Sequence, residues 1–403
     1  MPRYLPFLIL LFTGTLSISM VVPFMGFFLV EGLGFDPWVI SVYAGAVAVI
    51  VVVLNKGFAK AMDAGVPAFR MVGVAAVGSL VAAASLAAAP ILPVVLSLGV
   101  LGFGAGSSAL STMFSLGTVV AGRSGLKATT FNAYMRATTS TAWMIGPAAS
   151  FLIADWFAAT VVFDAVAVVV LVWIALWLTV TPRGASPARK TAGMDKKDAA
   201  AVSQASISDM ALWIAGGFIG CLAAAHFLTF TALPLFFVRE VGLPGYAPGN
   251  AFSVKTAVEI VAIACTPTLI ARFGIRQSLT GTAVLAVGAI LYLASVETYG
   301  QMIVGAALEG LYYGLFSTLA IGWVQSLAPE RPAQATAVYW NATMTTSVLA
   351  GPAAGLIAQG YDFRSAVLAG AGLAAIALAI IAVGGRHRAI IAIERIRTSD
   401  QAN

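Results

Sequence analysis

The stretch ATTFNAYMRATTSTAWMIGPAASFLIA, residues 128–154, decides the fold because it is long enough to cross a membrane as a helix yet carries a full charge near its middle. That charge is Arg136. An arginine at the centre of a membrane helix costs about 2.5–3.5 kcal/mol on insertion scales, so it normally faces a bundle interior or a water-filled cavity. The break Gly146-Pro147 follows in the same stretch. We therefore expect residues 128–154 to form one wall of a transport pathway.

The composition of the whole chain agrees with a membrane environment. Of its 403 residues 60% are hydrophobic and only 9% are charged, whereas soluble domains have roughly 25% charged residues. Apolar runs of about 20 residues, the length that spans a bilayer as a helix, recur from end to end. The expected spans are 4–30, 37–58, 71–89, 92–120, 128–153, 158–180, 210–238, 249–271, 278–295, 300–327, 334–358 and 363–384.

A polar segment divides these spans into two sets of six. Residues 181–209 hold Pro, Ser, Ala and mixed charges without apolar periodicity, which is typical of a linker. The expected organisation is therefore a six-helix bundle over 1–180, a cytoplasmic linker over 181–209, a second six-helix bundle over 210–384 and a cytoplasmic tail over 385–403. The predicted fold class is an all-α polytopic membrane protein with twelve transmembrane helices in two halves.

The two halves share local sequence. Gly146-Pro147-Ala148-Ala149 matches Gly351-Pro352-Ala353-Ala354, and on this alignment Arg136 falls opposite Asn341. The ends of the first spans of each half also match, with FLVE at 28–31 and FVRE at 237–240. A six-plus-six repeat is the architecture of major facilitator transporters, whose substrate site lies at the membrane midplane between the repeats.

The distribution of basic residues predicts the orientation. With an inside N-terminus, eighteen Lys and Arg residues fall in cytoplasmic segments, two fall in outer loops and two lie within spans, which accounts for all 22. By the positive-inside rule both termini are cytoplasmic, and we expect a multi-pass protein of the plasma (inner) membrane. Because the positive charges lie in loops between spans, the net charge of +6 does not indicate a nucleic-acid partner.

Four titratable residues are candidates for proton coupling. Lys255 and Glu259 are four residues apart and so share a helix face. Glu259 lies about ten residues from the outer end of its span, or ~15 Å at 1.5 Å per residue, and Glu309 and Arg136 reach a similar depth. A buried carboxylate beside a cation can titrate as access alternates. The alternative is a static Lys255–Glu259 pair that only holds its helix in place.

Polar and aromatic residues within the spans are candidates for substrate binding. Aromatic rings can stack on a sugar ring and hydrogen-bond it, although most such side chains pack or anchor helices at the interface. A lone histidine is likewise often a packing residue. The candidates are Arg136, Asn132, Tyr134, Trp143, His226, Trp340 and Asn341. We find no nucleotide-binding loop, no His/Cys cluster with metal-ligand spacing and no hydrolase constellation, so the sequence predicts a non-enzyme without cofactor or metal.

The stretch 135–147 resembles the sugar efflux transporter family of the major facilitator superfamily. The similar residues are Met135-Arg136-Ala137 and then Ser140-x-Ala142-Trp143-x-Ile145-Gly146-Pro147. Glu259-Ile260, Asn341 and the EVGLP sequence at 240–244 also agree with the family, so the resemblance covers nearly the whole chain. It implies proton-driven efflux of sugars or glycosides, with Arg136, Trp143, Glu259 and Asn341 in the site.

The chain also departs from this family. Ala232-Leu233-Pro234 lacks the acidic residue that the family has before this proline, Glu309 stands where an amide is usual, and Lys255 is unusual. The loop KGFAKAMDAGVPAFR at 56–70 is a degenerate form of the superfamily's Gly-x-x-x-Asp signature. A plain solvated turn is the alternative to a gating role here. The gating candidates are Lys60, Asp63, Gly65, Arg70, Gly146 and Pro147.

The leading hypothesis is a monomeric, proton-coupled exporter of small polar solutes, with sugars or glycosides as the expected cargo, that works by alternating access among membrane lipids. A first alternative is the same fold carrying drugs, siderophores or other metabolites in either direction, since drug antiporters share the Gly-Pro motif. A second is a membrane receptor or scaffold without transport. Midplane charges argue against the scaffold, because a scaffold would have little reason to bury them.

Overall fold

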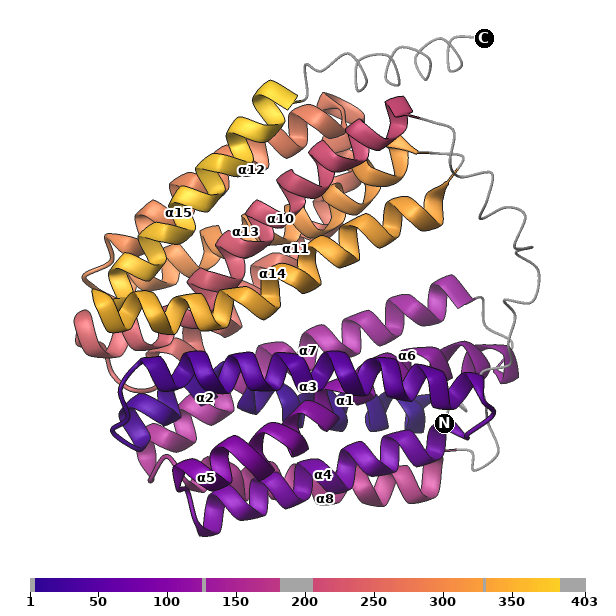
Figure 1. Cartoon of the computed structure of the whole chain (residues 1–403), viewed down its shortest axis with the longest axis vertical. Coiled ribbons are helices and arrows are strands. Elements are labelled where there is room, and N and C mark those ends of the chain that lie inside the picture. Colours follow the sequence, from indigo (N-terminus) through magenta and orange to yellow (C-terminus); the bar gives the residue numbers. More distant parts are fainter. Residues whose placement is uncertain (1–3, 125–127, 182–205, 329–330, 385–403) are drawn as a thin grey trace. The chain divides into compact units, whose positions relative to one another are not determined.

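The computed structural model describes residues 4–124, 128–181, 206–328 and 331–384. These residues are almost entirely helical (Figure 1). The linker over 181–209, beyond its two ends, and the tail over 385–403 fall outside the described residues, so the predicted boundaries there stay predictions. By contacts the chain forms two units: residues 1–190 with 237–253, and residues 191–236 with 254–403.

The helices of the first unit follow the expected spans closely. Pro23 separates the first two helices, consistent with the loss of a backbone donor at proline. The helices are α1 (Leu5–Val21), α2 (Phe24–Phe27), α3 (Trp38–Asp63), α4 (Ala68–Ala88), α5 (Leu92–Val94), α6 (Val100–Arg123), α7 (Ala128–Trp156) and α8 (Val161–Val180). Short π-helical turns, Phe28–Gly32 and Val95–Gly99, continue α2 and α5.

The helices of the second half repeat this plan. They are α10 (Ser206–Leu235), α11 (Ala247–Phe273), α12 (Ile275–Ala294), α13 (Tyr299–Leu327), α14 (Pro332–Gly360) and α15 (Phe363–Ala379). A π-helical turn, Phe236–Glu240, follows α10 and corresponds to Phe28–Gly32 after α2. These are the two segments whose sequences match at 28–31 and 237–240, so the internal repeat extends to an irregular backbone feature. A further π-helical turn, Ile380–Gly384, ends α15.

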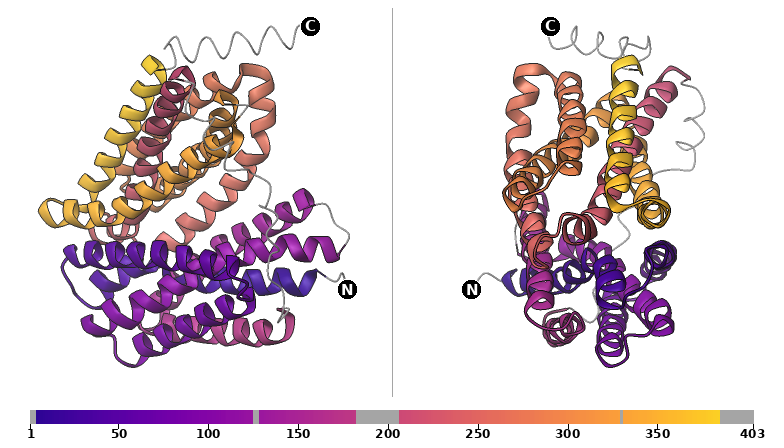
Figure 2. Two further views of the ribbon diagram at one scale, coloured as in Figure 1. Left: turned by 45° about the vertical axis from the view of Figure 1, so that its right-hand side comes forward. Right: turned by 90° about the vertical axis from the view of Figure 1, so that its left-hand side faces the viewer.

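Corresponding helices also pair in the same way. In the first unit α1 packs against α7 and α8, and α4 packs against α6 and α8. In the second unit α10 packs against α14 and α15, and α12 packs against α13 and α15. Figure 2 shows the helices of each bundle from two further sides. The same pairs recur at corresponding places, so each half is one copy of a six-helix repeat.

The described residues include ten helical segments that are long and apolar enough to cross a membrane. The other two expected spans are α7 and α14, each 29 residues long with a proline inside the helix, Pro147 and Pro352. They fall outside the ten because polar side chains interrupt their apolar sequence. α7 and α14 occupy the same position in the two repeats, so the most polar spans are a symmetric pair. The predicted fold class is confirmed.

Helix α7 packs on α1 through small residues. The Ser19 hydroxyl donates to the Ala142 carbonyl at 2.9 Å, and the Ser150 hydroxyl donates to the Met20 carbonyl at 2.8 Å. Between these bonds a Cβ added at Gly146 would lie 2.1 Å from Ser19 Oγ and 3.0 Å from Met20 N. Only glycine therefore allows this approach, as is usual where membrane helices pack closely.

We predict that Gly146→Ala destabilises the protein by about 1–3 kcal/mol, the usual cost of overpacking a tight interface. The measurement is the thermal unfolding midpoint of the purified protein in detergent. Gly57→Ala is the matched control, because no atom lies within 4 Å of a Cβ at this position in α3, and its midpoint should stay level or rise slightly. Equal midpoints for the two variants would show that α7 does not approach α1 this closely.

Candidate functional site

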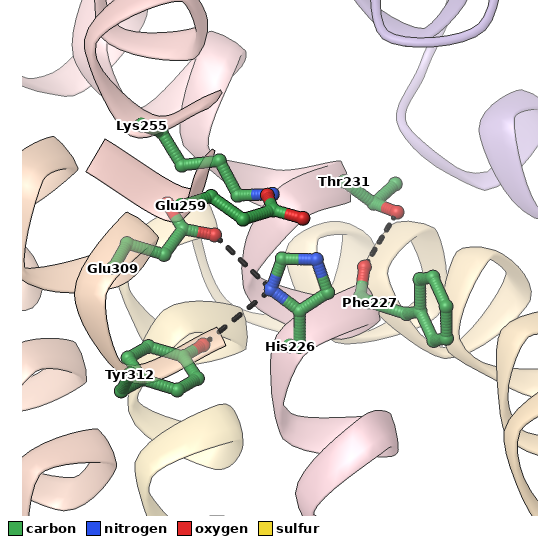
Figure 3. A network of polar contacts seen from close by, with 7 residues as sticks. All are labelled: His226, Phe227, Thr231, Lys255, Glu259, Glu309 and Tyr312. Carbon is green, nitrogen blue, oxygen red and sulfur yellow. Dashed lines mark hydrogen bonds and ion pairs between the residues drawn. The ribbon is translucent and has the colours of Figure 1, made fainter. Parts of the chain in front are cut away.

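Titratable side chains from three helices meet inside the second unit (Figure 3). α10 contributes His226, α11 contributes Lys255 and Glu259, and α13 contributes Glu309. We call these four residues the buried cluster. Lys255, Glu259 and Glu309 are predicted from the sequence as proton-coupling residues, and His226 is predicted as a substrate-binding residue.

Lys255 and Glu259 form an ion pair within α11. Lys255 Nζ lies 2.6 Å from Glu259 Oε2, and the spacing of four residues brings both side chains to one face. The lysine side chain is 8% exposed and the glutamate side chain is 20% exposed. Glu259 is therefore the more accessible carboxylate of the buried cluster, and its charge is balanced locally.

His226 and Glu309 form a second and deeper pair. His226 Nδ1 lies 3.3 Å from Glu309 Oε1, and the two side chains are 3% and 2% exposed. Glu309 Oε1 has no well-aligned hydrogen bond within the described part of the chain. The Tyr312 hydroxyl lies 3.5 Å from the same imidazole nitrogen. A buried carboxylate with so little hydrogen bonding is a costly group, and such groups concentrate at functional sites.

Tyr313 touches both pairs. Its ring stacks on the His226 ring with centroids 3.6 Å apart and an interplanar angle of 20°. Lys255 Nζ lies 4.4 Å from the centroid of the same ring, within cation–π range. Tyr312 and Tyr313 are among the span aromatics that could stack on a sugar ring, but they are not among the preferred candidates predicted from the sequence. They follow Glu309 by three and four residues and so share its helix face.

Two glycines of α13 bring α11 close to the buried cluster. A Cβ added at Gly310 would lie 2.1 Å from the Lys255 carbonyl oxygen, and one at Gly314 would lie 2.6 Å from the Glu259 carbonyl oxygen. At these two glycines the α13 backbone therefore lies directly against the α11 backbone, beside Lys255 and Glu259. The close packing fixes the positions of Lys255 and Glu259 relative to Glu309.

Arg136 belongs to the first unit, so the buried cluster does not include it. On α7 it is exposed, as is Asn132, and Trp143 is half-buried. Intervals of four and seven residues place these three side chains on one face of the helix. No hydrogen bond or ion pair of the Arg136 guanidinium occurs among the described residues. This face therefore presents a charged donor, an amide and an indole together.

Tyr134 lies elsewhere on α7. It is two residues from Arg136, which is about 200° around a helix of 3.6 residues per turn. It shares its side of the helix with the exposed Ile145 and Leu152, and its ring stacks on Tyr4 with centroids 5.9 Å apart. The structure thus does not bring Tyr134 to the face that carries Arg136. In the second half, Trp340 and Asn341 of α14 are both exposed.

The gating candidates near 60–70 surround the turn between α3 and α4. Lys60 lies in the last turn of α3, which ends at Asp63, whose side chain is outside the described part. Gly65 has φ +89°, a left-handed conformation that favours glycine. Lys60 and Arg70 are exposed. The conformational role of Gly65 is thus clear, while the gating role of this turn stays a prediction.

We predict that Tyr313→Leu destabilises the protein by about 1–3 kcal/mol, because it removes both the stacking on His226 and the cation–π contact with Lys255. Tyr313→Phe is the matched control, since it keeps the ring. In detergent, the thermal unfolding midpoint of Tyr313→Phe should lie near that of the wild type, and that of Tyr313→Leu should be clearly lower. If both variants unfolded at the same midpoint, the ring contacts would contribute nothing.

The chain can be compared with known proteins at this point. The profile of the Major Facilitator Superfamily matches residues 7–339. Sugar efflux transporter A of Escherichia coli (strain K12) is 25% identical over 269 residues, covering 65% of this chain and 66% of that protein. Sugar efflux transporter B of Salmonella typhimurium is 24% identical over 369 residues, covering 89% of this chain and 90% of that protein.

Solved structures share the fold. The crystal structure of the nucleoside transporter NupG has a TM-score of 0.81 at 14% identity and covers 96% of this chain and 100% of that chain. A bacterial homolog of the human lysosomal transporter Spinster has a TM-score of 0.70 at 11% identity, covering 95% of this chain and 96% of that chain. The predicted resemblance to sugar efflux transporters is confirmed by their sequence similarity. Because the profile spans most of the sequence, the chain belongs to the major facilitator superfamily of membrane transporters, and it is a multi-pass integral membrane protein rather than an enzyme.

Proposed function

We propose that the protein is a proton-coupled secondary transporter that exports small polar solutes, with sugars or glycosides as the principal cargo, by alternating access. The observation that carries the proton coupling is the buried cluster, in which two carboxylates meet one lysine and one imidazole inside apolar helices. The similarity to sugar efflux transporters A and B supports the cargo class. The proposed proton-binding residues are the buried cluster of the second unit, and the proposed solute-binding residues lie on the Arg136 face of α7 in the first unit.

Glu259 is the proposed proton carrier. Its carboxylate is paired with Lys255 at 2.6 Å, and its side chain is 20% exposed, against 2% for that of Glu309. Protonation from outside would release Lys255 from the pair, and loss of the proton to the inside would restore the pair. Because an unpaired charge in a low-dielectric interior is costly, each protonation state favours a different local arrangement. This difference is what alternating access needs in order to couple solute to protons.

Arg136 is the proposed centre of substrate binding. A guanidinium offers five donors in a fixed fork, and hydroxyl groups of a sugar can accept from it. Asn132 adds an amide on the same face and Trp143 adds an aromatic surface for an apolar sugar face. Asn341 and Trp340 are the proposed solute-binding residues of the second unit, and they lie on α14, the counterpart of α7 in the second repeat.

The proposed setting is the inner membrane, with a monomeric protein and both termini in the cytoplasm. The excess of basic residues in the predicted inner segments supports this orientation. A second candidate function is export or import of drugs, siderophores or other metabolites. It is favoured by the presence of Lys255 and Glu309 in the buried cluster, where sugar efflux relatives are expected to carry other residues.

The test of coupling uses purified protein in proteoliposomes with a pH-sensitive dye inside and no imposed gradient. Addition of sugars, glycosides and amphipathic cations one at a time should give proton movement with the sugars or glycosides. Glu259→Gln should abolish this movement while leaving the fold intact. Glu297→Gln is the matched control, because Glu297 is exposed between α12 and α13. Undiminished proton movement in Glu259→Gln would refute the proton role, and a signal confined to cations would favour drug export.

The test of binding replaces Arg136 with Ala. Loss of hydrogen bonds from a charged donor, worth about 1.5–3 kcal/mol, should weaken affinity for the transported solute by about tenfold or more. Isothermal titration with the solute found in the transport assay measures this change. Arg123→Ala, at the exposed end of α6, is the control and should bind normally. Unchanged affinity in Arg136→Ala would remove this residue from the site.

A further inference from the structure

The charges of the buried cluster do not balance. Glu259 and Glu309 supply two negative charges when ionised, Lys255 supplies one positive charge, and a neutral His226 supplies none. With ordinary ionisation the set therefore carries one uncompensated negative charge. Glu309 is the more deeply buried of the two carboxylates, since the Glu309 side chain is 2% exposed. Glu309 Oε1 also has no well-aligned hydrogen bond in the described part of the chain.

Among the described residues, the helices packed around the buried cluster bring no second cation into an ion pair with Glu309. α14 contributes Tyr339, whose hydroxyl donates to the Ser317 carbonyl at 3.4 Å. α12 contributes Tyr292, which lies against Gly305, whereas Arg276 of the same helix is sixteen residues away, or ~24 Å. Arg364, at the start of α15, lies over the Phe236 ring. The remaining titratable groups of α10, α11 and α13 are Asp209, Cys221, Cys265, Arg272, Tyr299, Tyr312 and Tyr313.

We propose that the His226–Glu309 pair binds one excess proton in the resting protein. The proton lies between His226 Nδ1 and Glu309 Oε1, atoms 3.3 Å apart. It is held either as a carboxylic acid that donates to a neutral imidazole or as an imidazolium that donates to a carboxylate. Both forms make the buried cluster neutral overall. An uncompensated buried carboxylate would cost more than either form, because a low-dielectric interior penalises isolated charge.

This inference rests on the proposed function and deepens it. Glu259 exchanges protons with water, and the His226–Glu309 pair stores one. When the pair passes its proton to Glu259, Lys255 becomes free to balance Glu309. When Glu259 returns that proton to the pair, Lys255 pairs with Glu259 again. The buried cluster therefore holds one excess proton throughout, and Tyr313, which contacts both His226 and Lys255, lies between its two positions.

The chain offers a direct measurement, because it contains only two histidines, His226 and His387. In a His387→Gln background, magnetic resonance of isotope-labelled histidine reports the protonation of His226 alone. Infrared spectroscopy of the same full-length protein reports protonated carboxylic acids. At about pH 7.5, where a free imidazole with a pKa of ~6.5 is mostly neutral, one of the two signals should be present. A neutral imidazole together with no carboxylic acid would overturn the proposal.

Charge-changing variants separate charge balance from a merely structural role. Glu309→Gln and Glu259→Gln each remove one negative charge, so the excess proton should disappear. Lys255→Met in the Glu259→Gln protein restores the imbalance, and the proton should return to the His226–Glu309 pair. His226→Asn leaves the charge unchanged, so the proton should appear as a carboxylic acid at Glu309. A proton signal that stays the same in all these variants would overturn the proposal. A bound sodium ion in place of the proton would also overturn it.

The two proposals fail in different ways. The spectra are recorded without solute or gradient, so they report the resting proton whatever the cargo is. If the proton signal is present but Glu259→Gln still moves protons with solute, the proposed role of Glu259 is refuted and the proton on the His226–Glu309 pair is supported. If proton movement is lost in Glu259→Gln but the wild type shows no resting proton, the proton on the His226–Glu309 pair is refuted and the proposed function is supported.

Discussion

The compensation of charge inside apolar helices is the constraint on which the second half of this protein depends. Water cannot solvate Glu309 or Lys255 at their depth of burial, so every charge there must find a partner within the bundle or be neutralised by a proton. The contacts of His226, Tyr313 and the two α13 glycines all follow from that need. A membrane protein that retained these charges without using them would carry their cost for no gain.

The internal repeat makes the asymmetry of this arrangement informative. The two halves share helix pairing, a π-helical turn after α2 and α10, and polar spans with an internal proline. Yet the buried cluster belongs to the second half alone, while the first half presents Arg136 where the repeat has Asn341. Two copies of one scaffold have therefore acquired different chemistry. Under the proposed function, Arg136 of the first half would bind the solute and the buried cluster of the second half would bind the proton.

The sequence predicted the fold well because its signals are physical and local. Apolar runs of membrane-spanning length predicted ten spans among the described residues to within a few residues, and the repeat at Gly146-Pro147 paired the two more polar spans, α7 and α14. The site was predicted only in part. Helical spacing brings Lys255 to Glu259, but no local pattern reveals that His226, eighty-three residues before Glu309, lies 3.3 Å from it. That contact depends on how α10 packs near α13, which single-sequence periodicity does not encode. Tyr134 shows a second limit of the sequence. It is a polar aromatic residue of the same helix as Arg136, but its side chain lies on a different face of α7.

The close approach of α11 to α13 gives the buried cluster its sensitivity to movement. At Gly310 and Gly314 the two backbones leave no room for even a methyl group, so a shift of either helix must change the positions of Lys255 and Glu259 relative to Glu309. The energy of close charges varies steeply with distance in a medium of low dielectric constant. A displacement of α11 therefore changes the electrostatic energy of each carboxylate. Conversely, a change of protonation biases the packing of α11 on α13, because interactions of this kind act in both directions. The close glycine contacts beside Lys255 and Glu259 would thus link proton binding to helix movement in the proposed transport.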